Sequence, residues 1–357
     1  MLLEGIFPAI TTPFYPDGKL YLRKLEHNVD RYSRTQLAGM VVLGSTGEAV
    51  MLSLEEQREV LAVAMDAASP EKVMLAGIGQ ESVLHTLRLA EHAAILHYDA
   101  VLVRTPHFYR GQLHRPSGPQ HEMLTYYRAI ADQSPLPVVL YSVPDLTRYD
   151  LPVELVSELA QHPNIIGIKD SSGKQERIAA LVAAAQARKR SVTVTPIFAP
   201  VTTRMQFATP ENASQNFVAA DLLGQSGTAL AVAPPKTAIK TRQKEVGFAV
   251  LSGAAQNLLT SLDAGACGGV MAFAVCAPQC CYEIYTAWKE GDASLATEKQ
   301  QRLQQAAIRV GAQLGIPGIK HACDLNGYYG GRPRLPLLPL TADEQREVAT
   351  LMADIRY

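Results

Sequence analysis

The sequence predicts an α/β fold, a (β/α)8 TIM barrel with extra C-terminal helices and an insertion before its seventh strand. Eight short runs rich in apolar and β-branched residues alternate with longer amphipathic stretches. Continuous apolar runs are typical of parallel strands buried on both faces. The 357 residues, 47% of them hydrophobic, are enough for one large barrel with additions. The eight expected strands are Gly5–Phe14, Gly39–Gly44, Val73–Gly79, Asp99–Thr105, Pro137–Val143, Ile165–Lys169, Val246–Leu251 and Gly268–Phe273.

Composition and charge exclude several classes of function. The chain has 33 Lys and Arg against 34 Asp and Glu, so it lacks the basic excess that binds nucleic acid or anionic membranes. Its start, Met1–Gly5, has no basic residue, and no segment approaches the ~18 apolar residues of a membrane span. Five cysteines without zinc-finger spacing indicate reduced thiols. We expect a cytoplasmic protein whose partners are small molecules or other subunits, with no nucleic acid and no membrane.

Helix signals support the alternation and divide the chain. Ser53 and Glu56 form a capping box that opens the helix after the second strand, and Thr341 and Glu344 open the last helix in the same way. Residues 1–276 are predicted to form the barrel, and residues 277–357 a helical extension. The extension is expected to hold three helices, Gln279–Glu290, Ala293–Leu314 and Ala342–Ile355, separated by Gly- and Pro-rich turns.

Residues 190–245 form the expected insertion, between the sixth helix and the seventh strand. Connections of this kind usually run 2–6 residues, and this one is far longer. Its apolar runs Val192–Phe198 and Thr228–Val232 predict a small β-hairpin or an ordered flap. A helix-to-strand connection lies on the amino-terminal face of a barrel, whereas active sites form at the opposite face. We therefore expect the insertion to cover the barrel bottom or a subunit contact, away from the chemistry.

Lys169 is the most informative position in the sequence. On an extended strand Ile165, Gly167 and Lys169 share one face, and Gly167 leaves room beside the lysine stem. If this face points into the barrel, burial lowers the lysine pKa and frees the amine to attack a carbonyl carbon. The alternative is a lysine just past the strand that extends its ammonium to solvent.

Two further features lie at the carboxyl ends of predicted strands. Tyr141 is expected at the height of Lys169 on the neighbouring strand, where a phenol could carry protons; the alternative is an aromatic core residue. The loop Gly44–Glu48 offers consecutive N–H groups and two hydroxyls to a carboxylate, although the same residues would also make an ordinary tight turn. Gly77–Gly79 lacks the rest of a dinucleotide fingerprint and is interpreted as turn chemistry.

Taken together, these motifs resemble the dihydrodipicolinate synthase and N-acetylneuraminate lyase superfamily of class I aldolases. The likeness rests on Lys169 in Gly-Ile-Lys-Asp-Ser, Tyr141 in Tyr-Ser-Val-Pro, the Gly-Ser-Thr-Gly-Glu loop and the opening segment Gly5–Phe14. Within the superfamily the chain is most similar to 4-hydroxy-2-oxoglutarate aldolase, on the segments Thr105–Gly111, Pro137–Pro144, His162–Gly167, Gly315–Lys320 and Gly327–Gly331.

The resemblance implies a role for each matching residue and a homo-oligomer, either a dimer or a tetramer. It implies that Lys169 forms a Schiff base, that Tyr141 relays protons and that Ser45 takes part in the relay. The implied substrate-binding residues are Thr46, Gly47, Ser171, Gly253 and Tyr109. No metal and no organic cofactor are implied.

Two positions depart from the family pattern. Dihydrodipicolinate synthases carry an arginine for the substrate carboxylate where this chain has Leu146. The family's second relay tyrosine, which reaches in from a neighbouring subunit, is replaced by Phe108, with Tyr109 adjacent. The first departure disfavours dihydrodipicolinate synthesis, and the second removes a hydroxyl from the relay.

The predicted function is a class I retro-aldol cleavage of 4-hydroxy-2-oxoglutarate to pyruvate and glyoxylate. The first alternative is condensation of pyruvate with another aldehyde, as in dihydrodipicolinate synthase or a sugar-acid aldolase. The second is a catalytically silent paralogue that binds a 2-oxo acid. Arg110, Arg148 and His107 are the candidates for a distal substrate carboxylate.

Overall fold

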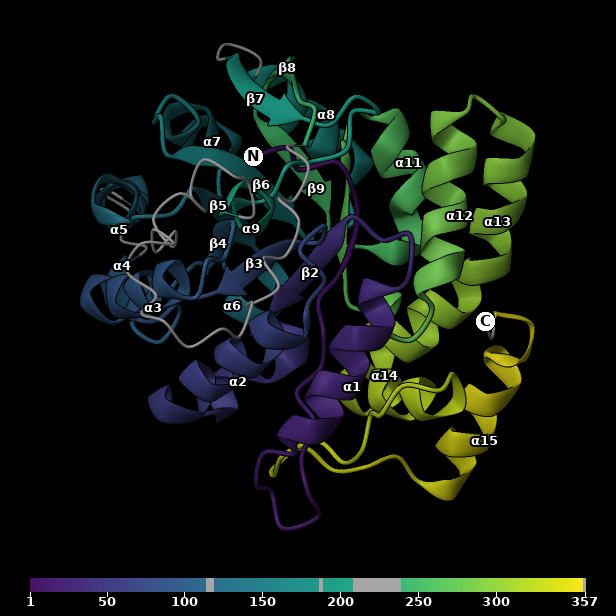
Figure 1. Ribbon diagram of the computed structural model, residues 1–357. Helices are drawn as coiled ribbons and strands as arrows, with labels where there is room; N and C mark the ends of the chain where they lie inside the picture. Colours follow the sequence, from purple (N-terminus) through teal and green to yellow (C-terminus); the bar gives the residue numbers. More distant parts are fainter. Residues whose placement is uncertain (114–118, 186–188, 208–238, 356–357) are drawn as a thin grey trace, which may run out of the picture.

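The computed structural model describes residues 1–113, 119–185, 189–207 and 239–355 and has a parallel β-barrel at its centre (Figure 1). Its eight parallel strands form one sheet in the order β1-β10-β9-β6-β5-β4-β3-β2. A bridge between Ala9 and Val41 joins its two edge strands and nearly closes the barrel. The predicted (β/α)8 class is confirmed. The barrel strands are β1 (Gly5–Pro8), β2 (Gly39–Val42), β3 (Val73–Gly77), β4 (Ala100–Arg104), β5 (Val138–Ser142), β6 (Ile165–Asp170), β9 (Ala249–Ser252) and β10 (Gly268–Met271).

The apolar strand residues separate into two buried sets because side chains alternate between the faces of a strand. One set, including Phe7, Leu75 and Leu251, fills the barrel interior. The other set, including Met74 and Val101, packs against the surrounding helices. Burial on both faces explains why the strands are apolar throughout.

Helices surround the barrel, and the two predicted capping boxes are confirmed at Ser53 and Thr341. The surrounding helices of at least six residues are α1 (Leu22–Ser33), α2 (Leu54–Ala67), α3 (Val83–Ile95), α5 (Pro119–Gln133), α7 (Val153–Leu159), α8 (Gln175–Ala184), α11 (Leu258–Asp263) and α12 (Pro278–Lys289). Shorter helices are α4 (Arg110–Leu113), α6 (Pro144–Thr147), α9 (Thr203–Phe207), η1 (Ser45–Gly47), η2 (Ala49–Met51), η5 (Ala255–Asn257), η6 (Phe273–Val275) and η8 (Ala353–Ile355). Over the described ranges, none of the helices has the length and apolar character needed to cross a bilayer.

The carboxyl-terminal part differs from the prediction in one helix. After α12 come α13 (Ala293–Ala306), a π-helical segment η7 (Ala307–Gln313), α14 (Gly315–Leu325) and α15 (Ala342–Leu351). The prediction of a turn in the Gly- and Pro-rich stretch after Leu314 was wrong. Pro317 lies in the first turn of α14, where a helix needs no backbone N–H donor, so the proline does not interrupt it.

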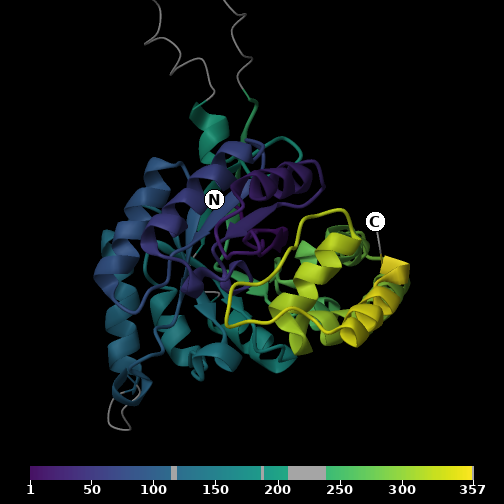
Figure 2. The same ribbon diagram turned by 90° about the horizontal axis from the view of Figure 1, so that it is seen from below.

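The described part of residues 190–245 contacts the amino ends of the barrel strands. Strands β7 (Arg190–Val194) and β8 (Arg242–Val246) form an antiparallel pair, so the run expected as Val246–Leu251 is divided between β8 and β9. The Thr203 N–H donates to Asp99, which directly precedes β4, over 2.7 Å. Figure 1 shows β7 and β8 together at the top of the view, and Figure 2 shows α9 at one end of the molecule. The predicted run at 228–232 lies outside the described residues.

Candidate active site at the carboxyl end of the barrel

Three neighbouring strands bring Arg104, Tyr141 and Lys169 to one level of the barrel. In the strand register Arg104 is the partner of Tyr141, and Tyr141 is the partner of Lys169. Each residue is the last or next to last of its strand, so all three lie at the carboxyl-terminal face, where barrel enzymes build their sites. Tyr141 and Lys169 therefore share the height that the sequence predicts.

An irregularity in β6 corrects the predicted face of Ile165. Val138 of β5 pairs with Ile165, but the next residue, Val139, pairs with Gly167. This bulge turns Ile165 toward the helices and Ile166 toward the barrel interior. A Cβ on Gly167 would lie 2.6 Å from the Ala249 carbonyl oxygen, so glycine is required by the approach of β9 rather than by the lysine stem.

The Lys169 side chain is buried against Tyr141 and not extended to solvent. Lys169 is 4% exposed, and its Nζ lies 4.1 Å from the centroid of the Tyr141 ring. The Tyr141 hydroxyl lies 3.3 Å from Ser45 Oγ. Burial would raise the pKa of Tyr141, but the charge of Lys169 and hydrogen bonding to Ser45, Lys169 and Ser171 outweigh it and lower the pKa below the usual value of 10.0. Because its pKa is lowered, the Tyr141 phenol gives up its proton more readily than an ordinary tyrosine.

The loop Gly44–Glu48 that carries Ser45 is held in an unusual backbone shape. Leu43 and Glu48 adopt left-handed conformations, with φ of 60° and 55°, at a cost of about 1–3 kcal/mol each. Buried Thr12 donates its hydroxyl to the Gly47 carbonyl over 2.6 Å. Thr46 and Gly47 lie buried in this turn beside Ser45. The predicted carboxylate-binding residues are therefore brought together on one short 3-10 turn.

Glu48 anchors the loop to the carboxyl-terminal helices. Its carboxylate pairs with Lys320 of α14 over 2.6 Å, and neither side chain is exposed. The backbone N–H of Arg334 donates to Glu48 over 2.7 Å. The carboxyl-terminal extension thus holds the loop Gly44–Glu48 in place through Glu48.

Ser171 and Gly253 lie together beside the end of β6. The Ser171 N–H donates to the Ser142 carbonyl, and the Gly253 N–H donates to the Asp170 carbonyl over 2.7 Å. A Cβ on Gly253 would lie 2.0 Å from Ser171 Oγ. Close packing against Ser171 therefore explains the glycine, and its N–H already has a partner.

Tyr109 is the predicted site residue that the single chain does not bring to the site. Tyr109 and Phe108 are 60% and 74% exposed, and their rings pack edge to face with centroids 5.1 Å apart. Glu81 holds this loop by accepting the N–H groups of His107 and Phe108, each over 2.9 Å. The loop therefore presents both rings outward.

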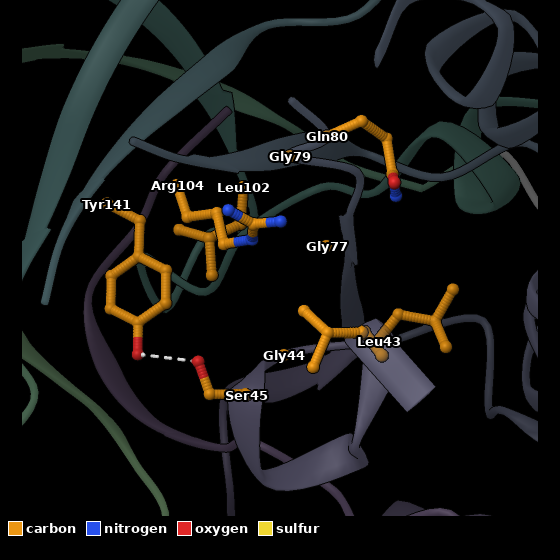
Figure 3. A pocket seen from close by; sticks show the side chains of 11 residues that line it. Leu43, Gly44, Ser45, Gly77, Gly79, Gln80, Leu102, Arg104 and Tyr141 are labelled. Carbon is orange, nitrogen blue, oxygen red and sulfur yellow. Dashed lines mark hydrogen bonds between the residues drawn. The ribbon is translucent and has the colours of Figure 1, made fainter. Parts of the chain in front are cut away.

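Arg104 is a cavity residue that sequence reasoning missed. Figure 3 shows its guanidinium projecting into the cavity beside Tyr141. The sequence did contain an indication of this. Ala100 and Leu102 face the barrel interior, and because side chains alternate along a strand, Arg104 lies on the same face. The cavity is lined by Gly44, Ser45, Gly79, Gln80, Arg104 and Tyr141, among others. Arg110 and Arg148, in contrast, are exposed.

The fold and the site define a barrel protein with a buried amine and an activated phenol at its carboxyl-terminal face. The sequence profile described as the Dihydrodipicolinate synthetase family matches residues 2–191 and 230–355. The chain belongs to this family. The unmatched residues 192–229 fall within the expected insertion.

Individual relatives and structures agree with this assignment. The 4-hydroxy-tetrahydrodipicolinate synthase of Methanothrix thermoacetophila is 28% identical over 99% of this chain and 98% of the relative. The Xanthomonas campestris pv. campestris protein of that name is 40% identical over 51% of this chain and 58% of the relative. A dihydrodipicolinate synthase from Acinetobacter baumannii, solved with pyruvate, has a TM-score of 0.76 and 24% identity, covering 99% of both chains. The last likeness supports the fold.

Family membership establishes the general activity. The family's members are carbon–carbon lyases of the class I aldolase group, and this chain is such an enzyme. The family does not by itself choose among 2-oxo-acid substrates.

Proposed function

We propose that the protein cleaves 4-hydroxy-2-oxoglutarate to pyruvate and glyoxylate through a Schiff base on Lys169. The arrangement of Lys169, Tyr141 and Ser45 carries this proposal. A buried amine beside a phenol of lowered pKa supplies both the nucleophile and the proton carrier that a class I aldolase needs.

The proposed reaction begins with imine formation. The neutral Lys169 amine adds to the C2 carbonyl, and loss of water gives an iminium that acts as an electron sink. Tyr141, as phenolate, accepts the proton of the 4-hydroxyl group while the C3–C4 bond breaks. Glyoxylate leaves, and the electron pair of the broken bond forms an enamine with the iminium.

The second half of the reaction releases pyruvate. The enamine takes up a proton at C3 from the Tyr141 hydroxyl, and water then hydrolyses the resulting iminium to pyruvate and the free lysine. Ser45, 3.3 Å from the Tyr141 hydroxyl, can exchange this proton with the phenol. The hydroxyl and N–H of Thr46 are proposed to hold the C1 carboxylate. The Gly47 N–H donates to the Gly44 carbonyl over 3.0 Å, so in this scheme Gly47 contributes the shape of the turn. In this scheme Ser171 supports the phenol of Tyr141 through a hydrogen bond.

The choice of substrate is supported by the motifs shared with 4-hydroxy-2-oxoglutarate aldolase and by Leu146. Leu146 is 61% exposed and offers no hydrogen-bond donor where dihydrodipicolinate synthases have an arginine. A charge-assisted hydrogen bond from that arginine would contribute about 1.5–3 kcal/mol.

A second candidate function is condensation of pyruvate with aspartate semialdehyde. The observation favouring it is that relatives matching nearly the whole chain are named 4-hydroxy-tetrahydrodipicolinate synthases. The test compares kcat/KM for cleavage and for condensation on one preparation. We expect faster cleavage; faster condensation would reverse the assignment.

Phe108 bears on the alternative of a silent paralogue. A phenyl ring has no hydroxyl to donate to a relay, and positioned acid–base groups typically contribute 10²–10⁴-fold. We propose that Phe108 slows proton transfer rather than imine formation, at a boundary between subunits of a homo-oligomer. Comparing turnover with adduct formation in Phe108→Tyr and Tyr109→Phe tests this. A loss of turnover in Tyr109→Phe with no gain in Phe108→Tyr would assign the relay to Tyr109.

A further inference from the structure

Arg104 is the last of the β4 residues whose side chains face the inside of the barrel, and the other residues on that face are apolar. Ala100 and Leu102 face the barrel interior, and Arg104 follows them on the same face. Arg104 is paired in register with Tyr141, whose partner on the other side is Lys169. At a strand spacing of about 4.8 Å, the backbones of Arg104 and Lys169 are about 10 Å apart. A short substrate attached to Lys169 can extend toward Arg104 across Tyr141.

The end of β3 is shaped to let Arg104 lie there. A Cβ on Gly79 would lie 2.6 Å from the Arg104 backbone nitrogen and 2.7 Å from its Cγ. Any other residue at position 79 would push the arginine stem away. Gly79, which was predicted to serve turn chemistry, thus makes room for the arginine.

The Arg104 guanidinium is fixed at one nitrogen and keeps donors at the others. Nη1 donates to Glu81 over 3.0 Å and to the Thr105 carbonyl over 3.1 Å, and it lies 2.9 Å from His107 Nδ1. Within the described ranges every side-chain hydrogen bond of Arg104 uses Nη1. Nε and Nη2 therefore retain donors for a ligand, while the ion pair with Glu81 holds the side chain in place. The guanidinium projects into the cavity (Figure 3).

We infer that Arg104 is a specificity-determining residue that binds a second carboxylate, at the end of the substrate farthest from the Schiff base. This inference rests on the proposed function, since 4-hydroxy-2-oxoglutarate carries carboxylates at both ends. The turn at Thr46 takes the C1 carboxylate in that scheme. A planar guanidinium suits the C5 carboxylate because it can donate two parallel hydrogen bonds.

The test compares substrates that differ only in this carboxylate. We would measure kcat/KM for 4-hydroxy-2-oxoglutarate and for 4-hydroxy-2-oxopentanoate, in which a methyl group replaces the C5 carboxylate. For Arg104→Gln we expect a loss of about 10–150-fold on the dicarboxylate, the range for one charge-assisted hydrogen bond. The monocarboxylate should change less than about 3-fold.

Two variants control for charge and folding. Arg88→Gln removes an exposed arginine of α3 that does not line the cavity, and it should leave both substrates unaffected. Arg104→Lys keeps the charge without the planar fork and should lose part of the preference for the dicarboxylate. An equal fall on both substrates in Arg104→Gln would overturn the inference, because it would indicate a structural role only.

A trapping measurement separates failure of this inference from failure of the proposed substrate. Borohydride reduction would be titrated with 2-oxoglutarate and with 2-oxopentanoate, which form imines without needing cleavage. If the wild type cleaves neither hydroxy acid but traps 2-oxoglutarate preferentially, and Arg104→Gln abolishes that preference, the proposed substrate is wrong and the inference stands. A preference that survives in Arg104→Gln refutes the inference.

Discussion

Two lysines are buried in the described part of the chain, and their surroundings differ in kind. Lys320 of α14 is fully buried, and its Nζ pairs with Glu48 over 2.6 Å and donates to the carbonyls of Thr12 and Arg332 over 2.9 and 3.0 Å. Lys169 is 4% exposed, but its amine lies over the Tyr141 ring. Over the described ranges, no carboxylate forms an ion pair with Lys169.

Burial alone therefore does not identify a reactive lysine. Burial lowers the pKa of Lys320, and the Glu48 carboxylate opposes that change. The ammonium of Lys320 has three oxygen partners to hold its three protons, so it joins structural elements and is unavailable as a nucleophile. Lys169 has a phenol where Lys320 has a carboxylate, and a phenol can exchange protons with an amine.

The residue next to Lys169 explains why no carboxylate pairs with it. Asp170 is buried, yet its carboxylate accepts from Arg177 Nε over 2.7 Å and from the Ser172 N–H over 3.0 Å. Because β-strand side chains alternate, Asp170 points away from the barrel interior that Lys169 faces. Asp170 is next to Lys169 in the sequence, but it is paired with Arg177 on the opposite face of the strand.

Lys169→Met should have the largest effect on turnover and the least harmful effect on stability. Turnover should be lost completely because the proposed nucleophile is gone. The melting temperature should stay the same or rise, because a buried amine without a carboxylate partner is replaced by an apolar chain of similar length. Steady-state cleavage and thermal unfolding on one preparation check both points. Residual turnover well above background would show that Lys169 is not the nucleophile.

Tyr141→Phe should lower turnover by about 10²–10⁴-fold, the usual contribution of a positioned acid–base group. The packing of the ring is preserved, so stability should change little. Adduct formation with pyruvate should persist, because the phenol is proposed to move protons rather than to form the covalent bond. Parallel measurements of turnover and of trapped adduct decide this; equal losses in both would assign Tyr141 to imine formation.

Lys320→Met should destabilise the protein by about 3–5 kcal/mol, since it leaves Glu48 buried without its partner. Urea unfolding monitored by circular dichroism measures the change. Adding Glu48→Gln should recover part of the loss, because the second substitution removes the uncompensated charge. If Lys320→Met proves as stable as the wild type, the proposed structural role of this lysine is wrong.

The smallest expected effect is on the pH profile of Ser45→Ala. Tyr141 has a pKa lowered below 10.0, and Ser45 contributes to that lowering. The basic form of the phenol therefore appears at lower pH than for an ordinary tyrosine, and the rise of kcat/KM with pH should level off below pH 10. In Ser45→Ala one stabilising hydrogen bond is lost, so the rise should move to higher pH. An unchanged profile would show that Ser45 does not tune the phenol.

The strand pattern allowed most of the barrel and the inner part of the site to be predicted. Tyr141 and Lys169 end apolar runs, and alternation on a strand is a local property that the sequence displays directly. The capping box at Ser53 is local in the same way.

Features that depend on distant partners could not be predicted. The β6 bulge that turns Ile165 outward arises from the ladder with β5. The pairing of Glu48 with Lys320 joins segments far apart in the chain, and nothing near either residue indicates it. Arg104 lay within a predicted strand, but its inward direction becomes informative only once the register with Tyr141 is known.

The most direct test of the central distinction between the two lysines is the intact mass after borohydride reduction in the presence of pyruvate, followed by peptide mapping. We expect one reduced pyruvate per chain, located on Lys169, and no modification of Lys320. The same single adduct should form in Tyr141→Phe, and none should form in Lys169→Met. An adduct on another lysine, or one that survives in Lys169→Met, would show that Lys169 is not the reactive lysine.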